Sequence, residues 1–231
     1  MQKSERVKAH FEEEAHEFDE LILKLIPHYE EMINALISSI PFNHDDSIKV
    51  LDLGCGTGTI TKNLKEKFPN ARVKCLDLAR NMIEMAKIKL QEYDNINYVI
   101  GDFYRLDISE KYDVIVSSLA LHHLVTDEDK KDFYKKIYAA LNPGGIFLNA
   151  DVVLGSNDNL QILYINKWKE FMSLSVSAKE IEEKWIPAAE AEDHPAKLVD
   201  QLKWLVEIGF RDVDVIWKYY GVAVYGGFKI N

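Results

Sequence analysis

Residues 50–61 constrain the fold most, because they join an apolar run to three glycines at alternate positions. Their sequence is V-L-D-L-G-C-G-T-G-T-I-T. The apolar run over residues 48–53 predicts a β-strand, and the spacing that follows predicts a helix. Glycine lets a ligand approach the main chain, and a helix N-terminus offers free N–H groups to an anion. An ordinary strand-to-helix turn needs one glycine, so three indicate a ligand-binding loop.

The rest of the chain repeats this alternation of strand and helix. Strands are expected at residues 72–77, 96–100, 112–118 and 146–153. Helices are expected over residues 80–93 and 127–141, where Thr126 serves as an N-cap. Helical crossovers join parallel strands, whereas the short turn at Tyr220-Gly221 makes the last two strands, 211–219 and 222–229, antiparallel neighbours. The prediction is an α/β, Rossmann-like, seven-stranded and mostly parallel sheet with helices on both faces.

The predicted core has helical additions on either side, within one domain overall. Residues 1–45 are expected to form helices over 4–25 and 28–39, acting as a lid or simply packing on an edge of the domain. Residues 46–155 form the core. Residues 156–209 are a helical insertion, broken near residues 173–177 and at Pro187 and Pro195. Long insertions of this kind usually carry substrate contacts. Residues 210–231 complete the sheet.

Composition narrows the classes of partner. The chain has 231 residues and a net charge of −10, which disfavours general binding to nucleic acid or to an anionic membrane. No apolar run approaches the roughly 20 residues of a membrane span. The first residues lack a signal peptide, and two cysteines, Cys55 and Cys75, make no disulfide framework. We therefore expect a cytoplasmic protein with a small-molecule partner, and a homodimer stays open.

Acidic residues follow the second and third predicted strands. Asp77 lies about 20 residues beyond the glycine loop, where nucleoside-binding α/β folds place the acid that accepts from ribose hydroxyls. Asp102 could accept from an adenine amine, with Phe103 beside the ring, or it could cap the next turn. Met82 could lie against the adenine or serve as a core residue. The dinucleotide fingerprint G-x-G-x-x-G would need glycine where this chain has Thr59, which disfavours a nicotinamide oxidoreductase.

These motifs resemble those of the class I S-adenosylmethionine (SAM) dependent methyltransferases over residues 49–151. Residues 52–58 resemble motif I, Asp77 the ribose acid, residues 101–103 the adenine-contact motif, residues 117–123 the motif after strand four, and residues 142–145 the turn before strand five. The resemblance implies SAM as cofactor and S-adenosylhomocysteine (SAH) as product. In that reading Asp52 suits the cationic end of SAM. The implied cofactor-binding residues are Asp52, Gly54, Cys55, Gly56, Thr57, Gly58, Asp77, Leu78, Met82, Gly101, Asp102, Phe103 and Ser118.

A narrower likeness lies in the flanking segments. Residues 26–29 and 208–227 look like those of the carboxy-SAM synthases, enzymes of tRNA wobble-uridine modification. That family uses an arginine to hold the extra carboxylate of its product. Trp204 takes the place of this arginine here, and the neighbouring Lys203 stays open as a substitute for it. Tryptophan cannot pair a carboxylate as a guanidinium does. From this likeness we therefore expect the same fold and the binding of SAM, and we do not expect carboxy-SAM synthesis.

Methyl transfer depends mainly on placing a nucleophile against the methyl carbon, and some acceptors also need a base. His122 and His123, directly after strand four, are the candidate catalytic bases, and at most one is expected to face the site. No spacing indicates a metal site, whether with Asp127 or with Glu128. Aromatic residues could wall an acceptor or could belong to the core. The candidate substrate-binding residues are Tyr29, Trp185, Trp204 and Tyr220.

Three functions follow from the sequence. The first is a SAM-dependent methyltransferase that acts on a small molecule, which agrees with the motifs and the acidic composition. The second is another SAM chemistry linked to tRNA modification, which a basic groove beside the cofactor would favour. The third is a non-catalytic SAM-binding protein, which a site closed to any acceptor would favour.

Overall fold

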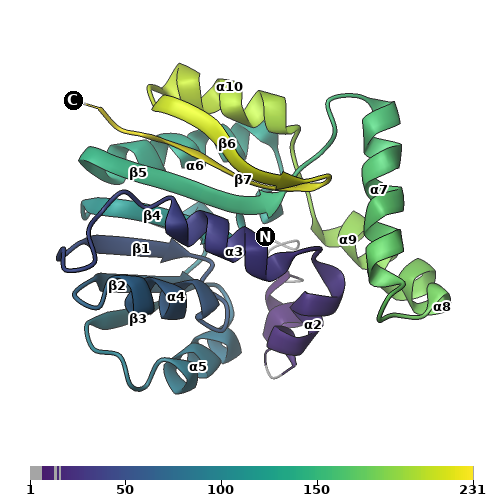
Figure 1. Ribbon diagram of the computed structural model, residues 1–231, viewed down its shortest axis with the longest axis horizontal. Coiled ribbons are helices and arrows are strands. Elements are labelled where there is room, and N and C mark those ends of the chain that lie inside the picture. The colour runs from purple at the N-terminus through teal and green to yellow at the C-terminus, as the bar shows by residue number, and fades with distance from the viewer. Residues whose placement is uncertain (1–6, 13–14, 16, 231) are drawn as a thin grey trace.

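The computed structural model describes residues 7–12, 15 and 17–230. Its centre is a sheet of seven strands in the order β3-β2-β1-β4-β5-β7-β6 (Figure 1). All strands run parallel except β7, which is antiparallel to both of its neighbours. The strands are β1 Lys49–Leu53, β2 Arg72–Asp77, β3 Ile96–Ile100, β4 Tyr112–Ser118, β5 Leu141–Val152, β6 Arg211–Tyr219 and β7 Val222–Phe228. The predicted mostly parallel sheet with its C-terminal hairpin is confirmed.

Strand β5 begins earlier than the sequence predicts. It pairs Leu141 with Tyr112 and then Ile146 with Val114, so residues 142–145 bulge out within the strand. Gly144 has φ +80° there, a conformation that glycine adopts without steric cost. The turn expected before strand five is therefore a bulge inside it.

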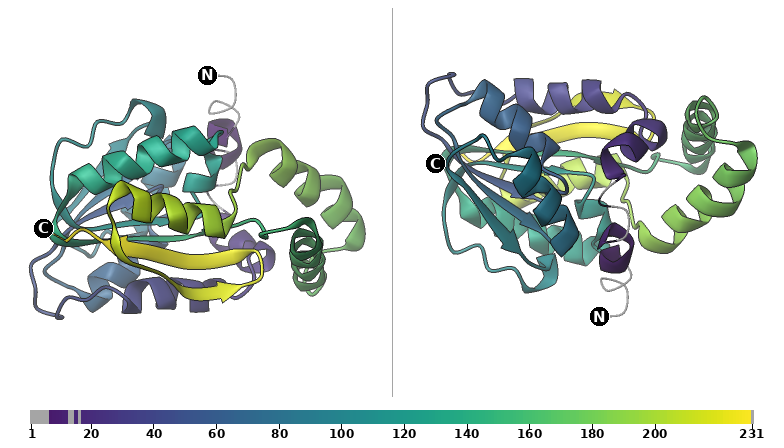
Figure 2. Two further views of the ribbon diagram at one scale, coloured as in Figure 1. Left: turned by 90° about the horizontal axis from the view of Figure 1, so that it is seen from above. Right: turned by 90° about the horizontal axis from the view of Figure 1, so that it is seen from below.

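Helices cover both faces of the sheet (Figure 2). One face carries α3 Tyr29–Ser38, α4 Thr59–Lys67 and α5 Arg80–Lys89. The other carries α6 Asp127–Ala140 and α10 Leu198–Ile208. Thr126 accepts a hydrogen bond from the backbone N–H of Asp129, whose carboxylate accepts in return from Thr126 N–H, so the predicted cap is a complete capping box. The apolar side chains of each helix layer form a core with one face of the sheet.

The N-terminal segment is not one continuous helix, contrary to the sequence prediction. Residues 7–12 are helical, Ala15 and Glu17 lie in turns, and α2 runs over Phe18–Leu25. The first residues of the predicted helix lie outside the described part of the chain. Helix α3 packs its buried side chains against the sheet, whereas Val7, Phe11 and Phe18 lie at the carboxyl ends of the strands.

Residues 158–192 form a helical arm beside this edge of the sheet (Figure 1). It consists of α7 Asp158–Met172, α8 Ala178–Glu180, the π-helical turn Ile181–Trp185 and α9 Ile186–Glu192. Pro187 does not break the arm, contrary to the sequence prediction. It lies in the first turn of α9, directly after the π-turn, where its missing N–H is tolerated.

Candidate active site

The glycine loop joins β1 to α4 and needs glycine for its conformation. Gly54, Gly56 and Gly58 all have positive φ, at +71°, +52° and +88°. A Cβ atom on Gly54 would lie 2.3 Å from Cβ of Ala120, whereas one on Gly56 would meet only Phe18, at 3.9 Å. The loop therefore packs tightly against the segment after β4 at Gly54 and leaves room at Gly56.

Gly54, Cys55, Gly56 and Thr57 line a cavity of about 350 Å³, the first cavity, at the carboxyl ends of β1 and β2. Gly58 does not line it. A Cβ atom on Gly58 would lie 2.8 Å from Leu90, so its glycine serves the packing of α4 against the end of α5.

Asp52 also lies outside this cavity, contrary to the expected contact with the cationic end of SAM. Its side chain is fully buried, because it points from β1 toward α4 and accepts a hydrogen bond of 2.6 Å from the Thr61 hydroxyl. Burial raises the pKa of Asp52 to about 7. The structure gives this acid the role of attaching the first turn of α4 to β1.

Asp77 lines the first cavity and also holds its loop. Its carboxylate accepts hydrogen bonds of 2.8 Å from Gly56 N–H and 2.9 Å from Ala79 N–H. Burial raises the pKa of Asp77 to about 6, although these backbone donors favour the charged form. Leu78 and Met82 line the cavity beside it, and Met82 is also part of a small core with Ala15 and Ala79.

The opposite side of the first cavity comes from the segments after β3 and β4. Gly101, Asp102 and Phe103 line it, and Asp102 also accepts from the N–H of Tyr104, which is the capping role considered for this acid. Its contact with adenine stays a prediction. Ser118 Oγ is buried and has no hydrogen-bond partner within the described part of the chain. A buried hydroxyl without a partner costs free energy unless a ligand pairs with it.

The residues of the first cavity fit SAM. Asp77 would hold the ribose hydroxyls, Met82 and Phe103 would flank the adenine, and the loop N–H groups and Ser118 would meet the polar groups of the methionine part. When bound, SAM supplies a methyl group on a sulfonium, whose positive charge is lost during transfer. Tyr29, the first residue of α3, lines the same cavity.

A second cavity, of about 490 Å³, adjoins the first. Its walls are mainly apolar and come from α2, α7, the π-turn and α9, with Trp185 and Tyr220 among them, as the sequence suggested. Among the described residues, five line both cavities: Phe11, Phe18, Leu119, His123 and Glu192. The arm and the N-terminal segment thus enclose an apolar space directly beside the first cavity.

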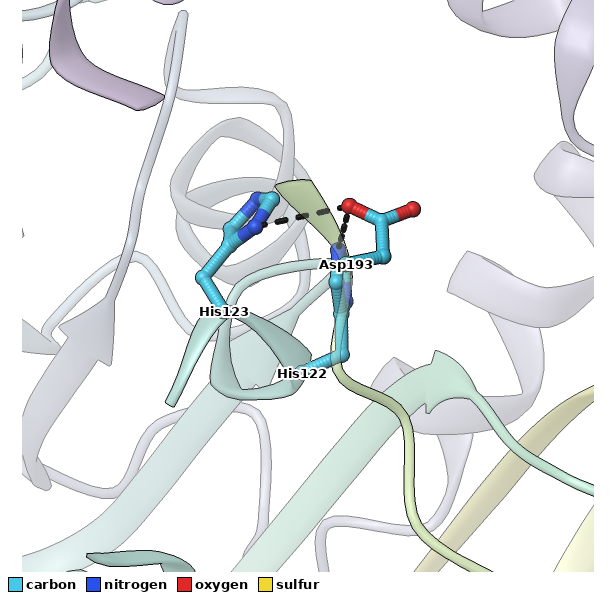
Figure 3. Close-up of side chains that lie close together, drawn as sticks. All are labelled: His122, His123 and Asp193. Atoms are coloured by element: carbon cyan, nitrogen blue, oxygen red, sulfur yellow. Dashed lines mark ion pairs between the residues drawn. The ribbon is translucent and has the colours of Figure 1, made fainter. Parts of the chain in front are cut away.

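The two histidines lie on the short 3₁₀ turn Leu121–His123 and have different surroundings (Figure 3). His122 is held between two carboxylates, with Nδ1 2.5 Å from Asp151 Oδ1 and Nε2 3.4 Å from Asp193 Oδ1. Burial alone would lower the pKa of His122, but Asp151 and Asp193 outweigh it and raise the pKa to about 10. Because both ring nitrogens face carboxylates, the predicted role of His122 as a catalytic base is not supported.

Of these two histidines, His123 is the one that lines the first cavity. Its Nδ1 lies 3.5 Å from Asp193 Oδ1 and 3.4 Å from the carbonyl oxygen of Glu192. Burial and the charged His122 ring lower the pKa of His123 to about 3, so its imidazole is neutral at physiological pH. The expectation that at most one histidine faces the cofactor therefore agrees with the geometry.

Trp204 lines neither cavity, so its predicted contact with substrate is wrong. It lies on α10 and is buried in the core between this helix and the sheet, with Lys131 Nζ 4.9 Å from its ring centre. Lys203 is exposed and pairs with Glu207, at 3.7 Å. In the described part of the chain, no arginine lines either cavity.

Sequence reasoning missed the acids that surround His122 and the aromatic wall from the N-terminus. Asp151 is an acid inside a buried strand, a pattern that could have signalled a polar partner. Asp193 follows the arm, and Phe11 and Phe18 lie on amphipathic helices. Nothing local distinguishes these residues from ordinary surface or core positions.

Known proteins resemble this chain in sequence and in fold. Residues 50–145 match the family model described as a methyltransferase domain. The chain is 26% identical over 220 residues to carboxy-S-adenosyl-L-methionine synthase of Nautilia profundicola, covering 94% of this chain and 93% of the relative. It is 31% identical over 180 residues to malonyl-[acyl-carrier protein] O-methyltransferase of Priestia megaterium, covering 73% and 62%. The solved DhpI–SAH complex shares the fold, with a TM-score of 0.68, 18% identity and coverage of 99% and 97%.

Fold, loop and family match together identify the chain as a class I SAM-dependent methyltransferase. Its cofactor is SAM. Among the described residues, no helix is both long enough and apolar enough to cross a membrane.

The affinity for SAH is expected to fall at acid pH through Asp77. Its pKa is raised to about 6, so the carboxylate that would accept from ribose loses its charge as the pH falls through 6. If the charged form alone binds, the dissociation constant at pH 5 is about 10-fold higher than at pH 7.5. Calorimetric titration with SAH across this range measures the effect. Asp77→Asn is the control, because its profile should be flatter; an unchanged profile would assign the titration to another group, such as Asp52.

Proposed function

We propose that this enzyme transfers the methyl group of SAM to a small-molecule acceptor held in the second cavity. The observation that carries the proposal is the shared wall of the two cavities, where Leu119 and His123 line both. A bound acceptor would lie next to the cofactor, and positioning supplies much of the rate of such a transfer. The apolar walls exclude water and favour a transition state in which the sulfonium loses its charge.

His123 contacts both cavities and would help to hold the reacting end of the acceptor. His122, fixed between Asp151 and Asp193, positions the turn that carries His123, since His122 N–H also donates to Asp151 Oδ2 at 3.1 Å. We assign His122 as a positioning residue.

The N-terminal helices would act as the lid of the site. Val7, Phe11 and Phe18 line the first cavity. The carboxylate of Glu12 accepts from the N–H groups of Arg80 and Asn81, at 2.7 and 2.8 Å, and so attaches the lid to the start of α5. The proposed division is thus a lid over residues 1–45, a core over 46–155, an acceptor-binding insertion over 156–209 and a final hairpin. Homodimer formation stays a prediction of the sequence.

Methyl transfer is favoured over carboxy-SAM synthesis, in spite of the extended similarity to a carboxy-SAM synthase. The arginine expected for the extra carboxylate has no counterpart along the described walls of either cavity. Trp204, at the corresponding place in the sequence, is part of the core.

Filling the second cavity tests the proposal. Ala189 lines the second cavity and not the first. Ala189→Trp is expected to lower SAH formation with an active acceptor by about 10-fold or more, because the indole would occupy the acceptor's space. Affinity for SAH should stay unchanged. Acceptors are found beforehand by screening small molecules for SAH release from SAM.

The matched control is Ala178→Trp, at an exposed position on α8 that borders neither cavity. It should leave both activity and SAH affinity unchanged. Full activity of Ala189→Trp would contradict the placement of the acceptor. A wild-type protein that binds SAH but releases none from SAM with any acceptor would favour the non-catalytic alternative.

A further inference from the structure

Three potential metal ligands converge beside the second cavity (Figure 3). His122 and His123 come from the turn after β4, and Asp193 follows α9, about 70 residues later in the chain. One ligand atom of each residue lies within 4.8 Å of the others. A backbone hydrogen bond holds the two segments together, because His194 N–H donates to the carbonyl oxygen of His122 at 2.9 Å.

The two distances from Asp193 to the histidine nitrogens match metal coordination better than direct hydrogen bonding. Asp193 Oδ1 lies 3.4 Å from His122 Nε2 and 3.5 Å from His123 Nδ1. Charge-assisted hydrogen bonds are shorter, at about 2.7–2.9 Å. A tetrahedral ion with bonds of about 2.0–2.2 Å separates its ligand atoms by roughly 3.3–3.6 Å. The contact of His123 Nδ1 with the carbonyl oxygen of Glu192 is also long, at 3.4 Å.

Asp151 supplies the outer support that metal-binding histidines usually have. It accepts from His122 Nδ1 at 2.5 Å, which directs Nε2 toward Asp193. Asp151 is buried and is itself held, with Val152 N–H donating to it at 2.9 Å and Asn149 Nδ2 at 3.3 Å. A carboxylate–histidine pair of this kind fixes the ring and its tautomer for ligation through the other nitrogen.

We propose that His122, His123 and Asp193 bind a divalent first-row transition metal ion, such as Zn²⁺ or Co²⁺. Two imidazoles and one carboxylate suit these ions, whereas Mg²⁺ and Ca²⁺ prefer oxygen ligands. Three protein ligands leave a coordination position open, and all three residues border the second cavity. If the proposed function holds, the ion would hold an oxygen of the acceptor at this position. The site was not expected from sequence, because Asp193 is remote from the histidine pair.

The test uses the tag-free protein after treatment with a chelator. Titration with Co²⁺, followed by its visible absorption, should show one equivalent bound with the intense bands of a tetrahedral site, and Zn²⁺ should displace it. His123→Gln and Asp193→Asn should each weaken Co²⁺ binding by about 100-fold, and Asp151→Asn by about 10-fold. His44→Gln is the matched control, since His44 is exposed and contacts the carbonyl of Lys67, and it should bind as the wild type does.

Absence of Co²⁺ absorption and of Zn²⁺ binding heat would overturn the metal site. So would unchanged binding by His123→Gln, since the ion would then lie elsewhere. Circular dichroism and thermal unfolding of each variant confirm that it is folded. Methyl transfer by the same metal-free protein separates the two proposals, because turnover without any metal, together with absent Co²⁺ and Zn²⁺ binding, would overturn the metal site and leave the proposed function standing.

Discussion

Replacing Asp77 with alanine is expected to weaken SAH binding by about 100-fold. The carboxylate would accept from both ribose hydroxyls, and hydrogen bonds to charged groups contribute about 1.5–3 kcal/mol each. A loss of about 3 kcal/mol corresponds to about two decades in the dissociation constant. The same carboxylate orders the glycine loop through Gly56 N–H, so the variant also loses preorganisation of the loop. Calorimetric titration with SAH measures the effect.

The fold should survive this change. Burial raises the pKa of Asp77 above its ordinary value, so holding this ionised carboxylate in the folded protein costs stability at neutral pH. Removing that buried charge offsets part of the cost of leaving Gly56 N–H and Ala79 N–H without their acceptor. Asp132→Ala, at an exposed position on α6, is the matched control and should bind SAH normally. Wild-type affinity in Asp77→Ala would show that the cofactor site is assigned incorrectly.

Gly54→Ala is expected to destabilise the protein by about 3 kcal/mol and to abolish SAH binding. The new Cβ atom would lie 2.3 Å from Cβ of Ala120, and the backbone at φ +71° disfavours any side chain. Relief of this clash must move the loop away from the segment after β4, and both line the first cavity. Thermal unfolding should show a fall of about 6–12 °C for a chain of this size.

Gly144→Ala separates the clash from the backbone strain. Gly144 has φ +80°, close to that of Gly54, but no atom lies within 4 Å of the position of its Cβ. Gly144→Ala should lower the stability of the protein by about 1 kcal/mol and leave its affinity for SAH unchanged. Equal destabilisation by the two variants would mean that the contact with Ala120 is unimportant.

The cofactor half of the site could be predicted from sequence because it depends on local order. In a parallel sheet the carboxyl ends of the strands meet at one edge, so the glycine loop, Asp77 and Asp102 had to converge there. The predicted contact of Asp52 with SAM is not seen, because side chains alternate along a strand and the side chain of Asp52 faces α4 and not the loop. The π-turn before Pro187 could not be foreseen, because it depends on how the arm closes on itself.

The acceptor half could not be predicted in the same way. Asp193 meets His122 only because α9 returns to the edge of the sheet, a contact across some 70 residues that no periodicity announces. The sequence predicts that Trp204 contacts the substrate, because it takes the place of the carboxy-SAM synthase arginine. An aromatic side chain on an amphipathic helix has an equally good place in the core, and α10 buries it there.

The two cavities are built from different parts of the gene product. Most of the first comes from residues 54–125, inside the stretch that matches the methyltransferase domain. Most walls of the second come from the N-terminal helices and the arm, outside that stretch. Substitutions at those outer residues that line only the second cavity, such as Ala189, can reshape the proposed space for the acceptor and leave the walls of the first cavity unchanged. A lineage carrying this architecture can therefore change what it methylates while keeping its methyl donor, which accords with the different activities named for its relatives.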